Sequence, residues 1–212
     1  MILSHEKVLI LAPHTDDGEL GCGGTIAKFI EEKAQVYYAA FSVCEDSVQI
    51  EMPKNTLEME LRQAIAVLGI SPSHLIIHRY PVRHLPQNRQ NVLQNLIDIR
   101  ESINPDLVFL PSVSDIHQDH HTIYQEGLRA FRYTNMLGYE LPWNNLSFNT
   151  ISFAYLEERH ILKKIEALKK YISQKDRAYM NEEFVRSLAR ARGVQIGVHY
   201  AEAFEVIRLI IK

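Results

Sequence analysis

Short aliphatic runs alternate with longer amphipathic segments through the first two thirds of the chain. Residues 8–12, Val-Leu-Ile-Leu-Ala, are continuously apolar, which is typical of a strand that is buried on both faces. Residues 21–33 then carry Ile26, Phe29 and Ile30 at helical spacing, which predicts a helix after that strand. The same patterns predict strands at 36–42, 75–78 and 106–111 and helices at 56–68, 88–103 and 120–131.

This alternation of buried strands and helices favours an α/β fold, in which a Rossmann-like parallel sheet is flanked by helices on both faces. After Arg132 a polar and aromatic stretch through Asn145 has no clear period, and we interpret it as a loop. No repeat or linker divides the sequence, so we expect a single domain over residues 1–212. Further elements are predicted as helices at 157–171 and 179–192 and a strand at 203–211. The lysines at 163, 164, 169 and 170 are expected on the solvent-facing side of the first of these helices.

Composition narrows the class of protein. With 46% hydrophobic and 23% charged residues, the chain resembles an ordinary soluble globular protein. A net charge of −3 and a pI near 6.4 provide no basic face, so nucleic acid is not an expected partner. No apolar run reaches the ~18 residues that a membrane span requires, and the N-terminus lacks the pattern of a signal peptide. Two cysteines form no disulfide framework, and we expect a cytoplasmic protein.

Two polar clusters follow two of the predicted strands. His14, Asp16 and Asp17 come directly after the strand at 8–12, and the segment 117–121, His-Gln-Asp-His-His, follows the strand at 106–111. In open α/β sheets, ligands gather beyond the carboxyl ends of the strands, where neighbouring helices diverge. If these two strands are neighbours, the two clusters meet in one pocket.

Histidine and aspartate in such a pocket indicate a metal site. A catalytic zinc takes about three nitrogen or oxygen ligands and leaves one position open for water. His14, one of the two aspartates and one histidine of the second cluster satisfy that count, and the same donors also suit Fe²⁺ or Mn²⁺. The other aspartate is then free to take a proton from water, and a further histidine to act as acid or oxyanion partner. A metal site without catalysis, or helix capping by these side chains, would use the same residues.

Three segments resemble one known family. Residues 13–25, Pro-His-Thr-Asp-Asp-Gly-Glu-Leu-Gly-Cys-Gly-Gly-Thr, closely resemble the signature of the LmbE/PIG-L family of zinc-dependent de-N-acetylases. Residues 117–120, His-Gln-Asp-His, are similar to its HxDH motif, and residues 197–204 to its closing segment. The order and spacing of these matches make the resemblance specific.

The resemblance implies a role for each site residue. The zinc ligands would be His14, Asp17 and His120, with Asp16 as the general base and His117 as acid or oxyanion partner. Two acidic neighbours receive supporting roles: Asp119 orients His117 or caps the helix, and Glu19 belongs to the first helical turn.

One position departs from the family pattern. Leu57 stands where relatives often carry an arginine that contacts the substrate. Trp143, the only tryptophan, lies in the irregular stretch, where its ring could stack on a sugar. The residues considered for substrate contacts are therefore Arg62, Arg83, Arg89, Trp143 and His199.

The sequence thus predicts a Zn²⁺-dependent hydrolase that removes an N-acetyl group from an amino sugar or amino-sugar conjugate and releases acetate. An amidase acting on a non-sugar or thiol conjugate, or a metal-binding scaffold without turnover, are the alternatives. The expected partner is a small-molecule substrate of the N-acetylglucosamine type. The sequence leaves open which conjugate is used and whether the chains form a homo-oligomer.

Overall fold

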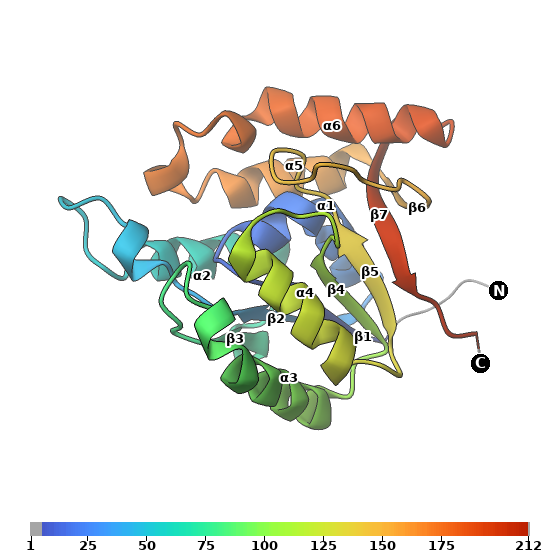
Figure 1. Ribbon diagram of the computed structural model, residues 1–212. Coiled ribbons are helices and arrows are strands. Elements are labelled where there is room, and N and C mark those ends of the chain that lie inside the picture. Colours follow the sequence, from blue (N-terminus) through green and yellow to red (C-terminus); the bar gives the residue numbers. More distant parts are fainter. Residues whose placement is uncertain (1–5, 212) are drawn as a thin grey trace.

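The computed structural model describes residues 6–211, which form one sheet between two layers of helices (Figure 1). The strand order is β3-β2-β1-β4-β5-β7-β6. β7 pairs antiparallel with both β5 and β6, and the other pairs of strands in the described residues are parallel. The strands are β1 (Lys7–Ala12), β2 (Gln35–Ala40), β3 (Leu75–Ile77), β4 (Leu107–Pro111), β5 (Asn135–Tyr139), β6 (Ser152–Leu156) and β7 (Tyr200–Arg208). The longer helices are α1 (Asp17–Glu31), α2 (Thr56–Leu68), α3 (Arg89–Ile103), α4 (Gln118–Ala130), α5 (Glu158–Leu168) and α6 (Glu182–Gln195).

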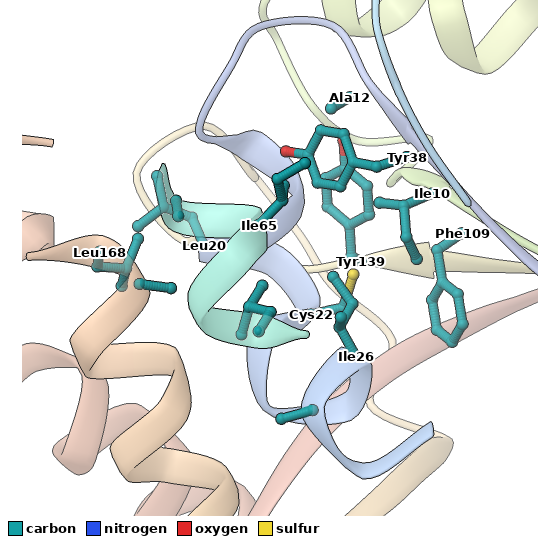
Figure 2. Close-up of a cluster of buried hydrophobic side chains, with 14 of the residues drawn as sticks. Ile10, Ala12, Leu20, Cys22, Ile26, Tyr38, Ile65, Phe109, Tyr139 and Leu168 are labelled. Atoms are coloured by element: carbon teal, nitrogen blue, oxygen red, sulfur yellow. The ribbon is translucent and has the colours of Figure 1, made fainter. Parts of the chain in front are cut away.

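The central strand β1 is buried on both faces, which explains its uninterrupted aliphatic sequence. Val8 and Ile10 pack on the side of α1, α2 and α5, and Leu9 and Leu11 pack on the side of α3 and α4. Figure 2 shows part of the first cluster, in which Ile10 lies close to Tyr38 and Tyr139. β1 pairs in parallel with β2 on one side and β4 on the other, so the prediction of a Rossmann-like sheet covered on both faces is confirmed.

Some element predictions are wrong. β5 lies inside the stretch after Arg132 that was expected to be a loop, and β6 was not predicted at all. The sequence of β5, Asn-Met-Leu-Gly-Tyr, has no aliphatic run, and its pairing with β4 and β7 supplies the order that local pattern lacks. α1 begins at Asp17, four residues before the predicted start, because the first polar cluster itself forms its first turn.

α1 is kinked at Cys22, where φ is −146° and the helical backbone is interrupted. The Glu202 carboxylate accepts hydrogen bonds from the backbone N–H groups of Gly24 (3.1 Å) and Thr25 (2.7 Å), which begin the second half of the helix. Lys164 of α5 donates to the same carboxylate at 2.7 Å. Lys164 is buried, so its predicted place on a solvent-facing side is wrong; it neutralises an acid that caps a broken helix.

Gly21 allows α1 to lie directly on the sheet. A Cβ atom at this position would lie 2.5 Å from the ring of Tyr139, which is fully buried in β5. We expect Gly21→Ala to destabilise the fold by about 1–3 kcal/mol, because neither the helix nor the ring has room to move. Urea unfolding measures the change. An unaltered midpoint would show that α1 can shift away from β5 at no cost.

No helix within residues 6–211 is long and apolar enough to cross a membrane.

Candidate metal centre

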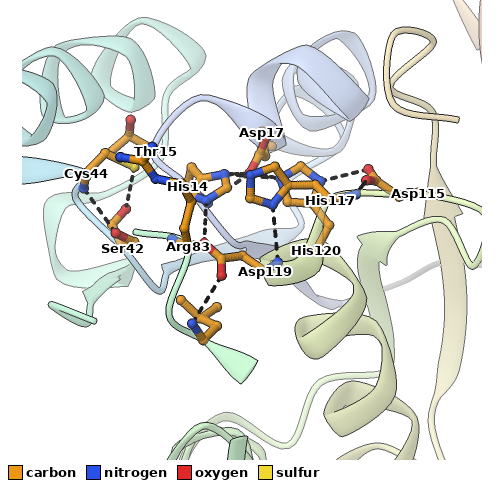
Figure 3. Close-up of polar contacts among 12 residues, drawn as sticks. His14, Thr15, Asp17, Ser42, Cys44, Arg83, Asp115, His117, Asp119 and His120 are labelled. Atoms are coloured by element: carbon orange, nitrogen blue, oxygen red, sulfur yellow. Dashed lines mark hydrogen bonds and ion pairs between the residues drawn. The ribbon is translucent and has the colours of Figure 1, made fainter. Parts of the chain in front are cut away.

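Two adjacent parallel strands bring the polar clusters together. β1 and β4 pair side by side, so the loops that follow them lie at the same edge of the sheet (Figure 3). His14 and Asp17 follow β1, whereas His117 caps the N-terminus of α4 and His120 lies in its first turn. His14 and His120 are 106 positions apart in the sequence, yet their ring nitrogens lie 3.1 Å apart.

Three donor atoms converge at one point. His14 Nδ1 and His120 Nε2 each lie 3.2 Å from Asp17 Oδ2, and 3.1 Å from each other. Zinc bonds of about 2.0–2.1 Å at tetrahedral angles separate two ligand atoms by about 3.3–3.4 Å. The triangle formed by His14, Asp17 and His120 therefore fits a zinc ion with little adjustment.

Each of the two histidines is oriented by a carboxylate on its other ring nitrogen. His14 Nε2 lies 3.0 Å from Asp119 Oδ2, and His120 Nδ1 lies 2.7 Å from Asp115 Oδ2. Such outer carboxylates fix the tautomer of a ligating histidine and raise its basicity. Sequence reasoning missed Asp115. The only feature of the sequence that could have indicated it is its position two residues before the second motif, 117–120.

Asp119 has a different partner from the one predicted. From the sequence, Asp119 was expected to orient His117 or to cap the helix. Its carboxylate instead contacts His14 and accepts from the backbone N–H groups of Arg83 (2.6 Å) and Leu85 (3.1 Å), and His117 is the cap. Its own backbone N–H donates to His117 Nδ1 at 3.2 Å. Asp119 thus ties the loop between β3 and α3 to the metal centre.

His117 is a second candidate for the third ligand. It offers a nitrogen within 4.8 Å of those of His14 and His120. His117 Nδ1 is already occupied as the cap of α4. Asp17 Oδ2 lies 3.2 Å from both His14 Nδ1 and His120 Nε2, the separation expected of zinc ligands, so the carboxylate fits the third position.

The charges of the cluster are strongly coupled. Burial alone would lower the pKa of His14 and His120, but the Asp17 charge and hydrogen bonds to aspartates raise these pKa values to about 9 and about 10. Burial opposes ionisation of Asp17 as well, yet the charges of His120 and His14 hold its pKa well below the usual range. The cluster is thus built to hold positive charge next to Asp17.

Asp16 stands apart from this network. Its carboxylate makes no hydrogen bond or ion pair with any other described side chain, although it lies beside the donor atoms and lines the same pocket. Burial and the neighbouring Asp17 charge raise its pKa to about 6, while the charges of His14 and Arg177 act in the opposite direction. A carboxylate with a pKa near neutrality and no partner is suited to accept a proton from water.

Glu19 lies beneath the turn and away from the pocket surface. It is fully buried and contacts the hydroxyl groups of Tyr38 and Tyr171, both of which also contact the Thr15 carbonyl. Each of these four oxygen–oxygen contacts needs a proton to be a hydrogen bond, and the two phenols supply only two protons. A protonated Glu19 adds a third proton to the group. Burial raises the pKa of Glu19 to about 8, in accord with a neutral carboxyl group.

This neutral carboxyl predicts a pH dependence of stability. Burial raises the pKa of Glu19 to about 8 in the folded chain, above its ordinary value of 4.5. The neutral carboxyl group therefore contributes its full stabilisation to the fold below pH 4.5, and this stabilisation is lost as the pH rises through about 8. Over this range the loss reaches at most about 1.4 kcal/mol per pH unit. Glu19→Gln, which is neutral at every pH, should therefore lose less stability than the wild type between pH 5 and 8. Parallel urea-unfolding profiles for the two proteins would contradict this.

A pocket of about 330 Å³ opens over the cluster. Of the residues considered for substrate contacts, Arg83 and Trp143 line it. Arg62 and Arg89 do not, because they pair with Glu58 and Glu126 away from the pocket, and His199 contacts Arg190 instead. Sequence reasoning missed several residues of the pocket wall, among them Asn144, Gln174, Arg177 and Tyr179.

The fold and the site define a class of protein, an α/β protein with histidine and aspartate donors converging at the strand ends. Residues 9–131 match the family described as PIG-L: GlcNAc-PI de-N-acetylase. The chain is also 31% identical over 172 residues to the uncharacterized deacetylase YaiS of Escherichia coli K12, covering 78% of this chain and 90% of that protein. This chain belongs to the PIG-L family of de-N-acetylases.

Solved structures share the whole fold. N,N'-diacetylchitobiose deacetylase from Pyrococcus horikoshii aligns with a TM-score of 0.81 and 23% identity over 96% of this chain and 84% of its own. GalB, the 4-carboxy-2-hydroxymuconate hydratase from Pseudomonas putida KT2440, aligns with a TM-score of 0.75 and 18% identity over 98% of both chains. Because both a deacetylase and a hydratase have this fold, the reaction must be argued from the side chains.

Proposed function

We propose that this protein is a zinc-dependent hydrolase that removes the N-acetyl group of an N-acetylglucosamine-type amino sugar or conjugate. The products are acetate and a free amine. The observation that carries the proposal is the convergence of His14 Nδ1, Asp17 Oδ2 and His120 Nε2 beside the unpartnered Asp16 carboxylate. Membership of a de-N-acetylase family supports the reaction type.

His14, Asp17 and His120 would hold the ion. When bound, zinc supplies a Lewis acid that polarises the amide carbonyl and lowers the pKa of water to roughly 7. Asp16 takes the proton from the attacking water as the new C–O bond forms, and the C–N bond then breaks. The proton ends on the leaving nitrogen, so that water is divided between acetate and amine.

His117 lines the same pocket, and one of its ring nitrogens is already engaged in a hydrogen bond. Its Nδ1 accepts from the Asp119 backbone, so in the neutral ring the proton lies on Nε2. Burial and the charges of His120 and His14 lower the pKa of His117 to about 4, so it is neutral near pH 7. A neutral Nε2–H is a hydrogen-bond donor for the oxygen that becomes negative in the tetrahedral intermediate, so His117 acts as oxyanion partner.

An aromatic pair supports a sugar as the substrate. Trp143 and Tyr179 stack with ring centroids 3.9 Å apart and an interplanar angle of 11°, and both line the pocket. Aromatic surfaces next to a few polar groups are typical of small-molecule sites. This pair would contact the apolar face of a sugar ring whose N-acetyl group lies over the metal centre.

A substrate panel tests the proposal. Zinc-loaded protein is incubated with N-acetylglucosamine glycosides, N-acetylated non-sugar amines and an acetylated thiol conjugate, and the mass of each product is measured. We expect loss of one acetyl group from the sugars, and no loss after chelation. Turnover of non-sugar amides alone would favour the amidase, and bound zinc without any product would favour a scaffold.

A further inference from the structure

Two arginines in the pocket wall lack a carboxylate partner. Within residues 6–211, no ion pair or side-chain hydrogen bond engages the guanidinium of Arg83. Among the same residues, the guanidinium of Arg177 contacts only Gln174 and Tyr179. It donates to the Gln174 side chain at 2.5 Å and lies 5.9 Å from the centre of the Tyr179 ring. In contrast, many other arginines pair with carboxylates: Arg62, Arg79, Arg89, Arg100, Arg129, Arg159, Arg186 and Arg192.

The backbone at Arg83 is held in an unfavourable conformation. Its φ is 70°, in the left-handed region that residues with a side chain seldom adopt. Its N–H donates to Asp119, and its carbonyl accepts from the Gln118 side chain, so both sides of the peptide are fixed to the start of α4. Such strain, when held by surrounding contacts, is concentrated at binding sites. The loop therefore holds the Arg83 backbone at a fixed place beside the histidine and aspartate cluster (Figure 3).

Arg177 reaches the pocket from a different part of the chain. It lies between α5 and α6, near enough to Asp16 for its charge to act on that carboxylate. Leu57 lines the same pocket with an apolar side chain. The positive charges of this pocket wall therefore come from the loop before α3 and the segment before α6.

Guanidinium groups have a specific chemistry. They remain charged at all physiological pH values, and their planar donors match the oxygens of a carboxylate or phosphate. An arginine that already pairs with a protein carboxylate has used this capacity. Arg83 and Arg177 have no carboxylate partner among the described residues, so their guanidinium donors remain available to a ligand. Both line the pocket that also contains His14, Asp16 and His120.

We propose that Arg83 and Arg177 bind an anionic group, a phosphate or a carboxylate, carried by the substrate at a distance from its N-acetyl group. This inference rests on the proposed function and narrows its substrate class to anionic amino-sugar conjugates. A neutral glycoside would fill the aromatic part of the pocket and leave both cations solvated.

Ligand binding tests the inference independently of turnover. Trp143 is the only tryptophan and lines the pocket, so its fluorescence reports occupancy. The probes are N-acetylglucosamine 1-phosphate, the carboxymethyl glycoside of N-acetylglucosamine and the neutral methyl glycoside. Titrations use zinc-loaded and chelated protein, since a probe held by arginine does not need the metal. We expect one or both anionic probes to bind about tenfold to a hundredfold more tightly than the methyl glycoside.

Arginine variants give the decisive comparison. Arg83→Gln and Arg177→Gln should each reduce the anionic-to-neutral affinity ratio about tenfold, and added salt should reduce it in the wild type. Arg62→Gln, exposed and paired with Glu58, is the matched control and should keep the ratio. The phosphate and carboxylate probes show which anion is preferred. A wild-type ratio near one, or a ratio unaltered in the double variant, would overturn the inference. Binding with the expected ratio but without acetate release would instead remove the proposed hydrolysis.

Discussion

Replacing Asp16 with asparagine is expected to lower kcat by about two to four orders of magnitude while zinc stays bound. Asparagine keeps the shape of the side chain but cannot accept a proton from water. Asp16 contributes no atom to the triangle of His14, Asp17 and His120, so metal content should not change. Acetate release and elemental analysis on the same sample measure both quantities.

A control separates this effect from a general loss of charge. Asp98 is an exposed acid on α3 that pairs only with Gln94 among the described residues, and Asp98→Asn should leave kcat unchanged. If Asp16→Asn retained wild-type turnover with zinc bound, the base would be another group and the assignment would be wrong.

Removing a donor atom should have an effect of a different kind. His120→Ala deletes one corner of the triangle, and we expect zinc to dialyse away and turnover to disappear with it. The substitution also removes the contact of His120 with two buried acids: Asp115 loses its histidine, and Asp17 keeps only His14. Zinc content, circular dichroism and acetate release are therefore measured together, so that unfolding is recognised.

Two further variants make this test specific. His121, next in sequence, is exposed and bonds to Gln125, so His121→Ala should keep both zinc and turnover. Asp115→Asn leaves every ligand in place and removes the charge that faces His120 Nδ1, while its amide oxygen can still accept from the His117 backbone. Zinc affinity should therefore fall about 10–100-fold without loss of fold. A fully zinc-loaded, active His120→Ala protein would exclude the proposed ligand set.

Much of the site follows from the sequence because it depends on local order. His14 and Asp17 come straight after a buried strand, and His120 begins the helix after another. Once those strands are parallel neighbours, their loops must meet. Spacing alone did not distinguish His120 from His121; the family resemblance favoured His120, and the structure places its Nε2 beside Asp17.

Other features depend on contacts between distant segments. Arg177 reaches the pocket from an irregular stretch between α5 and α6, where no periodicity predicts its direction. Lys164 was expected in solvent because it is charged, but it lies on the buried face of α5 with Ile161 and Leu168, where it donates to the Leu20 carbonyl and to Glu202. β5 is ordered by its two neighbouring strands. Such features arise from tertiary pairing, which a local pattern does not contain.

We propose that one zinc ion, held by His14, Asp17 and His120, makes this chain an active deacetylase. The most direct test of this claim is a titration of zinc into chelated, metal-free protein, with acetate release from an N-acetylglucosamine conjugate followed at each addition. We expect no turnover without metal and a rate that rises in proportion to bound zinc up to one ion per chain. Full turnover in metal-free protein, or a rate that ignores zinc occupancy, would contradict it.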